Sequence, residues 1–311
     1  MNSISVINSC TRMGQKKDGT QIAPHWLLKR GIEKKLRSKC SIFSKYDLEE
    51  HIYKHKDRLL NFKNFNIALE SMMSESILKS DLTINLGGDH SVGLGSLSGA
   101  LKTNHDLKVI WIDAHADINT FESSPSGNLH GMPLSFLMNL DKSQPSKTYF
   151  NEFQSLKKEN IVYLGLRDID PGELSILESN KIKFYSSKDI ENYGMELILE
   201  EVKNYLNLNL NDQVHISFDV DALDPRFIPC TGTPVEGGMI LEDVIKTFKF
   251  IKDNSNLKSF DLVEVNPLIG ANIDLEMTYE TIERFIDEII NVPTMKDEPL
   301  VISNENQTNL Y

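Results

Sequence analysis

Short apolar runs rich in β-branched and aromatic residues recur along the chain and alternate with longer stretches of helical character. Strands are expected at residues 4–8, 41–44, 82–86, 108–113, 161–166, 214–219 and 260–265. Helices are expected at residues 23–35, 59–78, 94–102, 171–178, 195–206, 241–253 and 279–291. Regular alternation of strand and helix indicates parallel βαβ units. The strands are almost continuously apolar, which is typical of a sheet that helices cover on both faces.

No linker, internal repeat or low-complexity tract divides the 311 residues, and α/β folds often reach this length as one unit. We therefore predict a single domain over residues 1–291. Residues 141–158 are polar and predict a surface excursion. Residues 292–311 are polar, contain two prolines and predict an extended tail.

Composition narrows the classes of partner. The net charge of −12 argues against nucleic acid and against an anionic membrane, because either would require a basic surface. It fits a protein that attracts metal ions or a cationic substrate. The three cysteines, Cys10, Cys40 and Cys230, are odd in number and far apart, so we expect reduced thiols and a cytoplasmic setting. The first residues lack an apolar leader, and no run approaches the ~20 apolar residues that span a bilayer.

The stretch VIWIDAHADINT, Val109–Thr120, is the first candidate functional segment. A buried strand ends here in Asp113, His115 and Asp117, which occupy alternate positions and would share one face of the strand. Two carboxylates and an imidazole on one face repel each other unless a cation lies among them. The alternative is a polar strand end that faces solvent.

Three further strands end in similar residues. His90 follows one of them in GGDHS, Asp219 and Asp221 follow another in SFDVDALDP, and Glu264 follows a third in EVNP. Ligands of parallel α/β proteins collect at the carboxyl ends of the strands, so these side chains should meet. Taken singly, His90 could be a core histidine, and each aspartate pair could be a solvated strand end. Several carboxylates cannot pack together without neutralisation, which predicts a pair of divalent cations. Oxygen and imidazole donors without cysteine favour Mn²⁺ before Zn²⁺.

Together GGDHS, DAHADINT and SFDVDALDP resemble the three metal-binding motifs of the ureohydrolases, the arginase and agmatinase family. The resemblance runs from the strand before GGDHS through EVNP. It implies a three-layer α/β/α sandwich with a central, mostly parallel sheet, and two Mn²⁺ ions per subunit. It implies one ion held by His90, Asp113, Asp117 and Asp219, and a second held by Asp113, His115, Asp219 and Asp221, so that Asp113 and Asp219 bridge.

Two loops between the motifs bear on the substrate. SSPSGNLHG resembles the arginase substrate loop, in which Ser126 and Asn128, with Asn119, would hydrogen-bond an α-carboxylate. GLRDIDPGE resembles the segment whose Asp170 and Glu173 would face the α-amino group, directly or through water. Agmatine lacks the carboxylate, so this pattern favours L-arginine.

The resemblance also assigns roles near the metals. His130 would act as a proton shuttle, since an imidazole titrates near neutrality; a structural histidine in a Gly-rich loop is the alternative. Glu264 would pair with the guanidinium, and its alternative is a strand-end charge. Thr233 would line the same pocket. Asp117 would accept the proton of the attacking hydroxide and pass it to the leaving amine.

The predicted function is manganese-dependent hydrolysis of the guanidinium group of L-arginine to L-ornithine and urea by a metal-bridging hydroxide. Another ureohydrolase, an agmatinase or a guanidino-acid hydrolase, is the nearest alternative. A non-catalytic metal-binding paralogue is a second alternative, although all six apparent ligands, His130 and Glu264 are present. By resemblance we expect a cytoplasmic homotrimer, or else a hexamer, acting in arginine metabolism and the urea cycle. By resemblance the loop NSCTRMGQKKDG is expected to border the active site, and it departs there from the Gly/Pro-rich loop usual in arginases.

Overall fold

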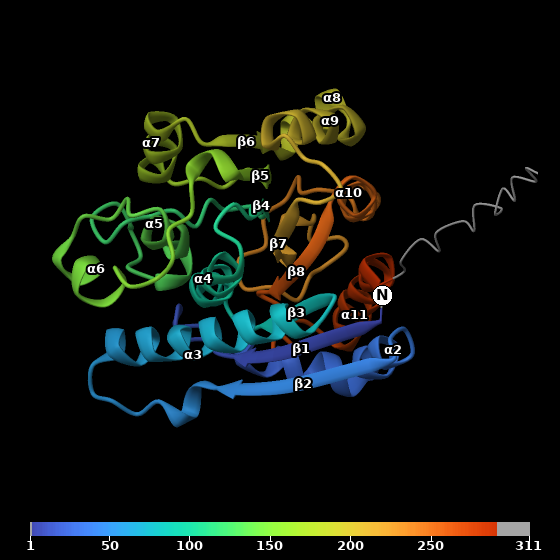
Figure 1. Ribbon diagram of the computed structural model, residues 1–311, viewed down its shortest axis with the longest axis horizontal. Helices are drawn as coiled ribbons and strands as arrows, with labels where there is room; N and C mark the ends of the chain where they lie inside the picture. Colours follow the sequence, from blue (N-terminus) through green and yellow to red (C-terminus); the bar gives the residue numbers. More distant parts are fainter. Residues whose placement is uncertain (1, 291–311) are drawn as a thin grey trace, which may run out of the picture.

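The computed structural model describes residues 2–290, and its core is one eight-stranded sheet (Figure 1). The strands are β1 (Ser3–Cys10), β2 (Ile42–Glu49), β3 (Leu82–Gly87), β4 (Lys108–Ile112), β5 (Ile161–Leu166), β6 (Lys183–Ser186), β7 (Gln213–Asp219) and β8 (Asn256–Val263). Their order in the sheet is β2-β1-β3-β8-β7-β4-β5-β6, and every neighbouring pair is parallel. The predicted α/β class with a parallel sheet is confirmed.

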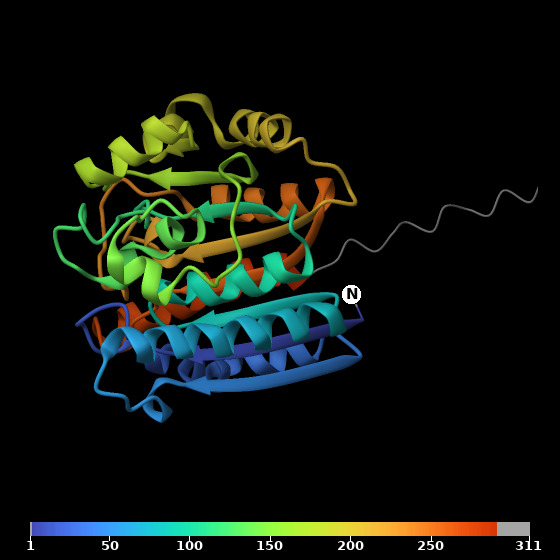
Figure 2. The same ribbon diagram turned by 60° about the vertical axis from the view of Figure 1, so that its left-hand side comes forward.

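Helices cover both faces of the sheet (Figures 1 and 2). One face packs against α1 (Ala23–Leu27), α2 (Glu33–Arg37), α8 (Ser187–Tyr193), α9 (Met195–Leu206), α10 (Leu241–Asn254) and α11 (Asn272–Ile290). The other packs against α3 (Arg58–Lys79), α4 (Gly93–Thr103), α5 (Pro133–Leu137), α6 (Gln144–Tyr149) and α7 (Pro171–Asn180). Strand β4 shows why two cores form: Ile110 and Ile112 belong to the first, Val109 and Trp111 to the second, because successive side chains point to opposite faces.

Several expected elements differ in extent. The helix expected at 23–35 is α1 and α2 joined by a wider helical turn, Leu28–Ile32, in which Gly31 has a φ of 135°. Helix α11 begins at Asn272 rather than 279, and β2 extends to Glu49. Strand β6 and helix α8 were not expected at all. Their short runs, KFYS and SKDIENY, carry little apolar periodicity.

Most of residues 141–158 lie at the surface, as expected, but the segment is also anchored in the core. The segment contains α6, and Phe150, Phe153 and Leu156 are buried in the core. These residues are spaced by three, a signal that the polar residues between them obscure. The expected tail at 292–311, and residue 291 before it, lie outside the described residues.

Four strands at the centre of the sheet position the candidate site. β3, β8, β7 and β4 are consecutive neighbours, and their carboxyl ends therefore open at one stretch of the sheet edge. The strand arrowheads in Figure 2 point toward this side. No helix within residues 2–290 is long and apolar enough to cross a membrane.

Candidate active site

The structure brings the predicted acidic and imidazole residues together at this edge. Asp113 directly follows β4, Asp219 is the last residue of β7, and Glu264 directly follows β8. His90 begins a single helical turn, His90–Val92, three residues after β3. The sequence positions are far apart, and the parallel order of the strands makes them neighbours.

His90 is the centre of the first group. Its Nδ1 lies 2.9 Å from Asp113 Oδ2, 3.0 Å from Asp117 Oδ2 and 3.4 Å from Asp219 Oδ2. This buried Nδ1 nevertheless makes no hydrogen bond of acceptable geometry to any described residue. Its Nε2 lies 2.9 Å from Ser217 Oγ. A nitrogen that faces three carboxylates without a hydrogen bond fits a metal ligand.

Behind His90, Ser217 fixes the tautomer that such a ligand needs. The Ser217 hydroxyl donates to Asp261 Oδ2 at 3.4 Å, so its oxygen accepts a hydrogen bond from the N–H at His90 Nε2. With the proton on Nε2, the neutral ring presents the Nδ1 lone pair to the carboxylates. The ring also stacks on Trp111, with centroids 4.0 Å apart, which holds its plane.

A second group shares Asp113. His115 Nδ1 lies 3.2 Å from Asp221 Oδ2 and 3.5 Å from Asp113 Oδ1. The backbone N–H of Asp221 donates to Asp219 Oδ1 at 2.8 Å, which links Asp219 at the end of β7 to Asp221 in the turn that follows. The donor atoms of His90, Asp113 and Asp117 lie within 4.8 Å of one another, and so do those of Asp113, His115 and Asp221. Five of the six predicted ligands therefore form two adjoining clusters with Asp113 in both. The sixth, Asp219, lies beside the first cluster, with Oδ2 3.4 Å from His90 Nδ1.

The electrostatics of the clusters indicate a shortage of positive charge. Burial, together with the neighbouring Asp113, raises the pKa of Asp117 to about 6. Burial and Asp221 raise the pKa of Asp219 well above its usual range. Burial opposes protonation of His90, but the surrounding carboxylates outweigh it and raise the pKa of His90. A divalent cation would relieve these costs, and carboxylate oxygen with imidazole nitrogen suits a hard-to-borderline ion.

Glu264 lies behind His90 and orients a second histidine. Its Oε1 accepts the backbone N–H of His90 at 2.9 Å and lies 3.0 Å from His130 Nδ1. Burial opposes the imidazolium, but the hydrogen bond and charge of Glu264 outweigh it and raise the pKa of His130 to about 9. The other oxygen, Oε2, accepts from Gln15 Nε2 at 2.8 Å. Sequence reasoning missed Gln15, although it belongs to the loop NSCTRMGQKKDG that was expected to border the site.

A cavity of about 110 Å³ opens beside the clusters. Its lining contains His115, Asp117, Asn119, Ser124, Ser126, His130, Gly131, Asp170, Glu173, Asp219 and Thr233. Thr233 Oγ1 donates to Asp221 Oδ2 at 2.9 Å, and Asn119 Nδ2 donates to Asp170 Oδ2 at 2.9 Å. Of the predicted catalytic and substrate-binding residues, Asn128 and Glu264 are not part of the lining. The Asn128 backbone N–H instead donates to Ser126 Oγ at 3.2 Å.

Glu173 has a structural role as well as a place in the cavity. Its Oε1 accepts the N–H of Ile118 and its Oε2 accepts the N–H of Asp170, each at 3.1 Å. The two bonds hold the first turn of α7 against the loop that carries Asp117. Burial, and then the charge of Asp117, raise the pKa of Glu173 to about 8.

Arg167 is a second residue that sequence reasoning missed. Its guanidinium donates to the carbonyls of Asp221 at 2.6 Å, Val235 at 2.8 Å and Ala222 at 3.1 Å. It thereby fixes the segment that follows β7. These three carbonyls lie more than 50 positions away in the sequence, so no side-chain pattern near Arg167 predicts the contacts.

Comparisons with known proteins agree with this geometry. The Arginase family profile matches residues 3–290. An arginase of Neurospora crassa is 38% identical over 282 residues, covering 84% of this chain and 78% of that protein. Arginase-1 of Mus musculus is 36% identical over 288 residues, covering 88% and 87%. The crystal structure of Entamoeba histolytica arginase in complex with L-ornithine superimposes with a TM-score of 0.83 at 31% identity, covering 94% and 98%. The chain therefore belongs to the arginase family and is a hydrolase of the arginase type.

Proposed function

We propose that this protein hydrolyses the guanidinium group of L-arginine to L-ornithine and urea. One observation carries the proposal: two carboxylate–imidazole clusters adjoin a cavity lined by Asn119, Ser126, Asp170 and Glu173. The cavity thus offers neutral donors for a carboxylate and acids for an ammonium, next to the groups that would act on the guanidinium. The ornithine bound in the Entamoeba histolytica relative supports an amino-acid ligand for this chain.

The proposed cofactor is a pair of Mn²⁺ ions per subunit. His90, Asp113, Asp117 and Asp219 would hold one, and Asp113, His115, Asp219 and Asp221 would hold the other. The unbonded Nδ1 of His90 and the raised pKa values of Asp117 and Asp219 support this assignment. Bound there, the ions would lower the pKa of water from ~15.7 toward ~7 and supply a nucleophile near neutral pH.

Side chains of the protein would carry out the proton transfers. Asp117 would accept a proton from the attacking water and return it to the leaving nitrogen as the carbon–nitrogen bond breaks. Glu264 occupies His130 Nδ1, so Nε2 is the ring nitrogen left to exchange protons at the cavity. Glu264 was predicted to pair with the guanidinium. Its carboxylate oxygens already bind His90, His130 and Gln15, so this pairing would require sharing an oxygen or releasing Gln15.

A urea-release assay on arginine, agmatine and guanidinobutyrate, side by side with Mn²⁺-loaded protein, tests the substrate. Buried polar groups left unpaired discriminate by up to ~10⁴–10⁵. Because the cavity is partly open to solvent, we expect arginine to exceed agmatine in kcat/KM by ~10²–10³. Equal rates on arginine and agmatine would favour another ureohydrolase, and release of urea from none of the three would favour a non-catalytic paralogue.

Metal analysis tests the cofactor independently of activity. Protein freed of metal with a chelator should rebind two Mn²⁺ per chain, and Asp113→Ala should lose both. A single tightly bound ion in active protein would contradict the proposal.

Assembly and location rest on the family and on the thiols. We propose a closed homo-oligomer, a trimer before a hexamer, acting in cytoplasmic arginine metabolism and in the urea cycle. All three cysteines are free, as a reducing compartment would require. Light scattering that gave a mass near 35.3 kDa, the mass of one chain, would overturn the oligomer.

A further inference from the structure

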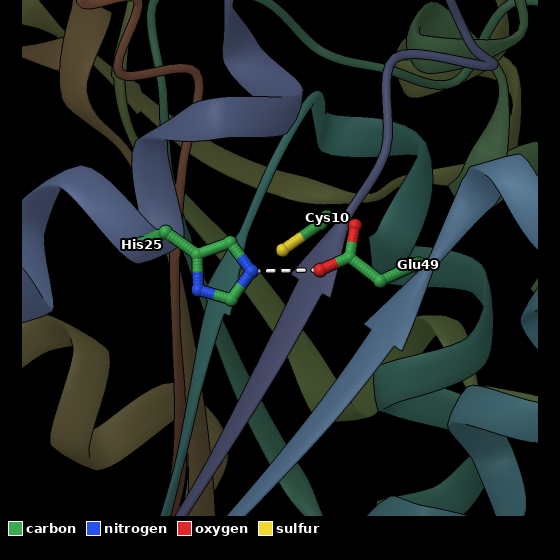
Figure 3. Close-up of side chains that lie close together, drawn as sticks. All are labelled: Cys10, His25 and Glu49. Carbon is green, nitrogen blue, oxygen red and sulfur yellow. Dashed lines mark hydrogen bonds and ion pairs between the residues drawn. The ribbon is translucent and has the colours of Figure 1, made fainter.

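A second cluster of potential metal ligands lies outside the residues assigned above. It consists of Cys10, His25 and Glu49, whose donor atoms all lie within 4.8 Å of one another. Figure 3 shows the thiol, the imidazole and the carboxylate pointing toward one another. The Nε2 of His25 lies 2.7 Å from Glu49 Oε1.

The fold places these three groups firmly. Cys10 is the last residue of β1 and Glu49 the last of β2, and the two are direct partners in the parallel register of these strands. His25 comes from α1, which packs against β1. The ligand set is therefore built on two paired strand ends and a helix, which hold ligand positions better than a loop.

The donors favour a cation that prefers sulfur. We propose that Cys10, His25 and Glu49 form a peripheral site for a thiophilic divalent cation of the Zn²⁺ class. Thiolate, imidazole and carboxylate are the three side-chain ligands that Zn²⁺ takes in proteins, and three of them leave a fourth position for water. The side chain of His25 is 52% exposed and that of Glu49 is 32% exposed, so two of the three ligands face solvent above the buried thiol. Mn²⁺ prefers oxygen donors and would favour the other clusters.

The local charge also favours a cation. Burial, and then the nearby carboxylates of Glu49, Asp47 and Glu50, raise the pKa of the Cys10 thiol. A second imidazole, that of His51, also lies near Glu49, with Nδ1 3.7 Å from Oε2. A bound divalent ion would reverse the effect on the thiol, because it stabilises the thiolate that coordinates it.

The site is close to the active site in the chain. Cys10 and His25 flank the loop whose Gln15 bonds Glu264 and whose Gly14 carbonyl accepts the N–H of His130. A cation held by Cys10 and His25 would join both ends of this loop. The inference does not depend on the substrate proposed above, because it concerns three residues outside the arginine pocket.

Cobalt provides a selective probe, because a cobalt–thiolate bond gives a near-ultraviolet charge-transfer band that oxygen and nitrogen ligands do not give. The predicted Mn²⁺ ligands include no cysteine, so Co²⁺ that exchanges into the Mn²⁺ site does not absorb in this band. Full-length, Mn²⁺-loaded protein is titrated with Co²⁺ in a buffer that contains a phosphine reductant, which keeps the thiols reduced. We expect a band that saturates at one ion per chain and that added Zn²⁺ abolishes.

Three variants assign the band. Cys10→Ser should remove it, and the matched control Cys40→Ser should keep it, since Cys40 is a half-exposed thiol bonded to the Leu36 carbonyl. His25→Ala changes an exposed side chain, retains the thiol and should weaken Co²⁺ binding at least ~10-fold, because even outer-shell changes cost 10–100-fold. The proposal is overturned if the wild type shows no band, if Cys10→Ser keeps it, or if His25→Ala binds Co²⁺ as tightly as the wild type. In those cases His25 and Glu49 form only a surface hydrogen bond.

Discussion

Asp117 and Glu264 have left-handed backbone conformations, with φ of 50° and 63°. Such conformations are uncommon for residues with a side chain, and they persist where surrounding contacts enforce them. The Glu264 N–H donates to the Gly88 carbonyl at 2.8 Å, and the Asp117 carbonyl accepts from Leu134 at 3.2 Å. At Lys181 and Asn207, in contrast, the same conformation merely ends a helix. The strained backbone therefore occurs at the proposed proton acceptor, Asp117, and at Glu264, which orients His130.

The link between Glu264 and His130 can be tested by charge removal. Glu264→Gln keeps an oxygen for the His90 N–H but removes the carboxylate that stabilises the imidazolium. The pKa of His130 should then fall from about 9 toward its ordinary value near 6.5, as followed by an NMR titration of metal-free protein. Gln15→Ala, which removes a hydrogen bond from Glu264 without changing its charge, is the control and should leave the pKa raised. An unchanged pKa in Glu264→Gln would contradict this reading.

Comparing arginine with agmatine separates contacts to the substrate's amine from contacts to its carboxylate. Agmatine keeps the amine of arginine and lacks its carboxylate. Asp170→Asn should therefore lower kcat/KM for both substrates by ~10–100-fold, the value of a charge-assisted hydrogen bond, while Mn²⁺ content stays at the wild-type level. Asn128→Asp should lower the arginine rate alone, because it sets a carboxylate against a carboxylate. If Asn128→Asp leaves the arginine-to-agmatine ratio unchanged, its position outside the cavity lining persists when substrate binds, and Asn128 has no part in specificity.

At the scale of elements, the exit of β7 depends on a residue from the exit of β5. Arg167 holds the carbonyls of Asp221, Ala222 and Val235, so Arg167→Ala should leave several buried acceptors unpaired. We expect a loss of about 2–4 kcal/mol in the free energy of unfolding, measured by urea denaturation of metal-free protein. Mn²⁺ affinity should fall as well, because Asp221 loses its support.

Arg226→Ala is the matched control for that experiment. The Arg226 side chain is 77% exposed and pairs with Asp224, a geometry worth about 0–1 kcal/mol. A loss in Arg226→Ala equal to that in Arg167→Ala would refute the special role of Arg167.

At the scale of the whole molecule, the buried acids should make metal-free protein sensitive to pH. The pKa values of Asp117, Asp89 and Glu173 are raised to about 6, 7 and 8, chiefly by burial. The folded state thus binds protons more tightly than the unfolded chain, and stability falls as pH rises through these values. The raised pKa of His130, about 9, acts in the same direction, since its contribution is complete below ~6.5 and is lost through about 9.

The melting temperature of chelator-treated protein should therefore decrease between about pH 5 and pH 8. Mn²⁺ should suppress the decrease, because the cations neutralise the carboxylates. Calorimetry at several pH values, with and without Mn²⁺, measures both. A melting temperature that does not change with pH in metal-free protein would show that ionising the buried acids does not destabilise the fold.

The sequence by itself determined the alternation of strands and helices, the parallel sheet and the residues that end its strands. This was possible because apolar periodicity is local, and because parallel strands must bring their carboxyl ends to one edge. His90, Asp113, Asp219 and Glu264 could be assigned to one site without knowing the strand order.

Only the tertiary structure decided which distant groups meet. The strand order made β3, β8, β7 and β4 neighbours, and the register of β1 on β2 set Cys10 beside Glu49. The bonds from Gln15 to Glu264 and from Arg167 to the carbonyls after β7 join residues 54 to 249 positions apart. No periodicity encodes such pairs, because they arise from the packing of whole elements rather than from the propensity of any one.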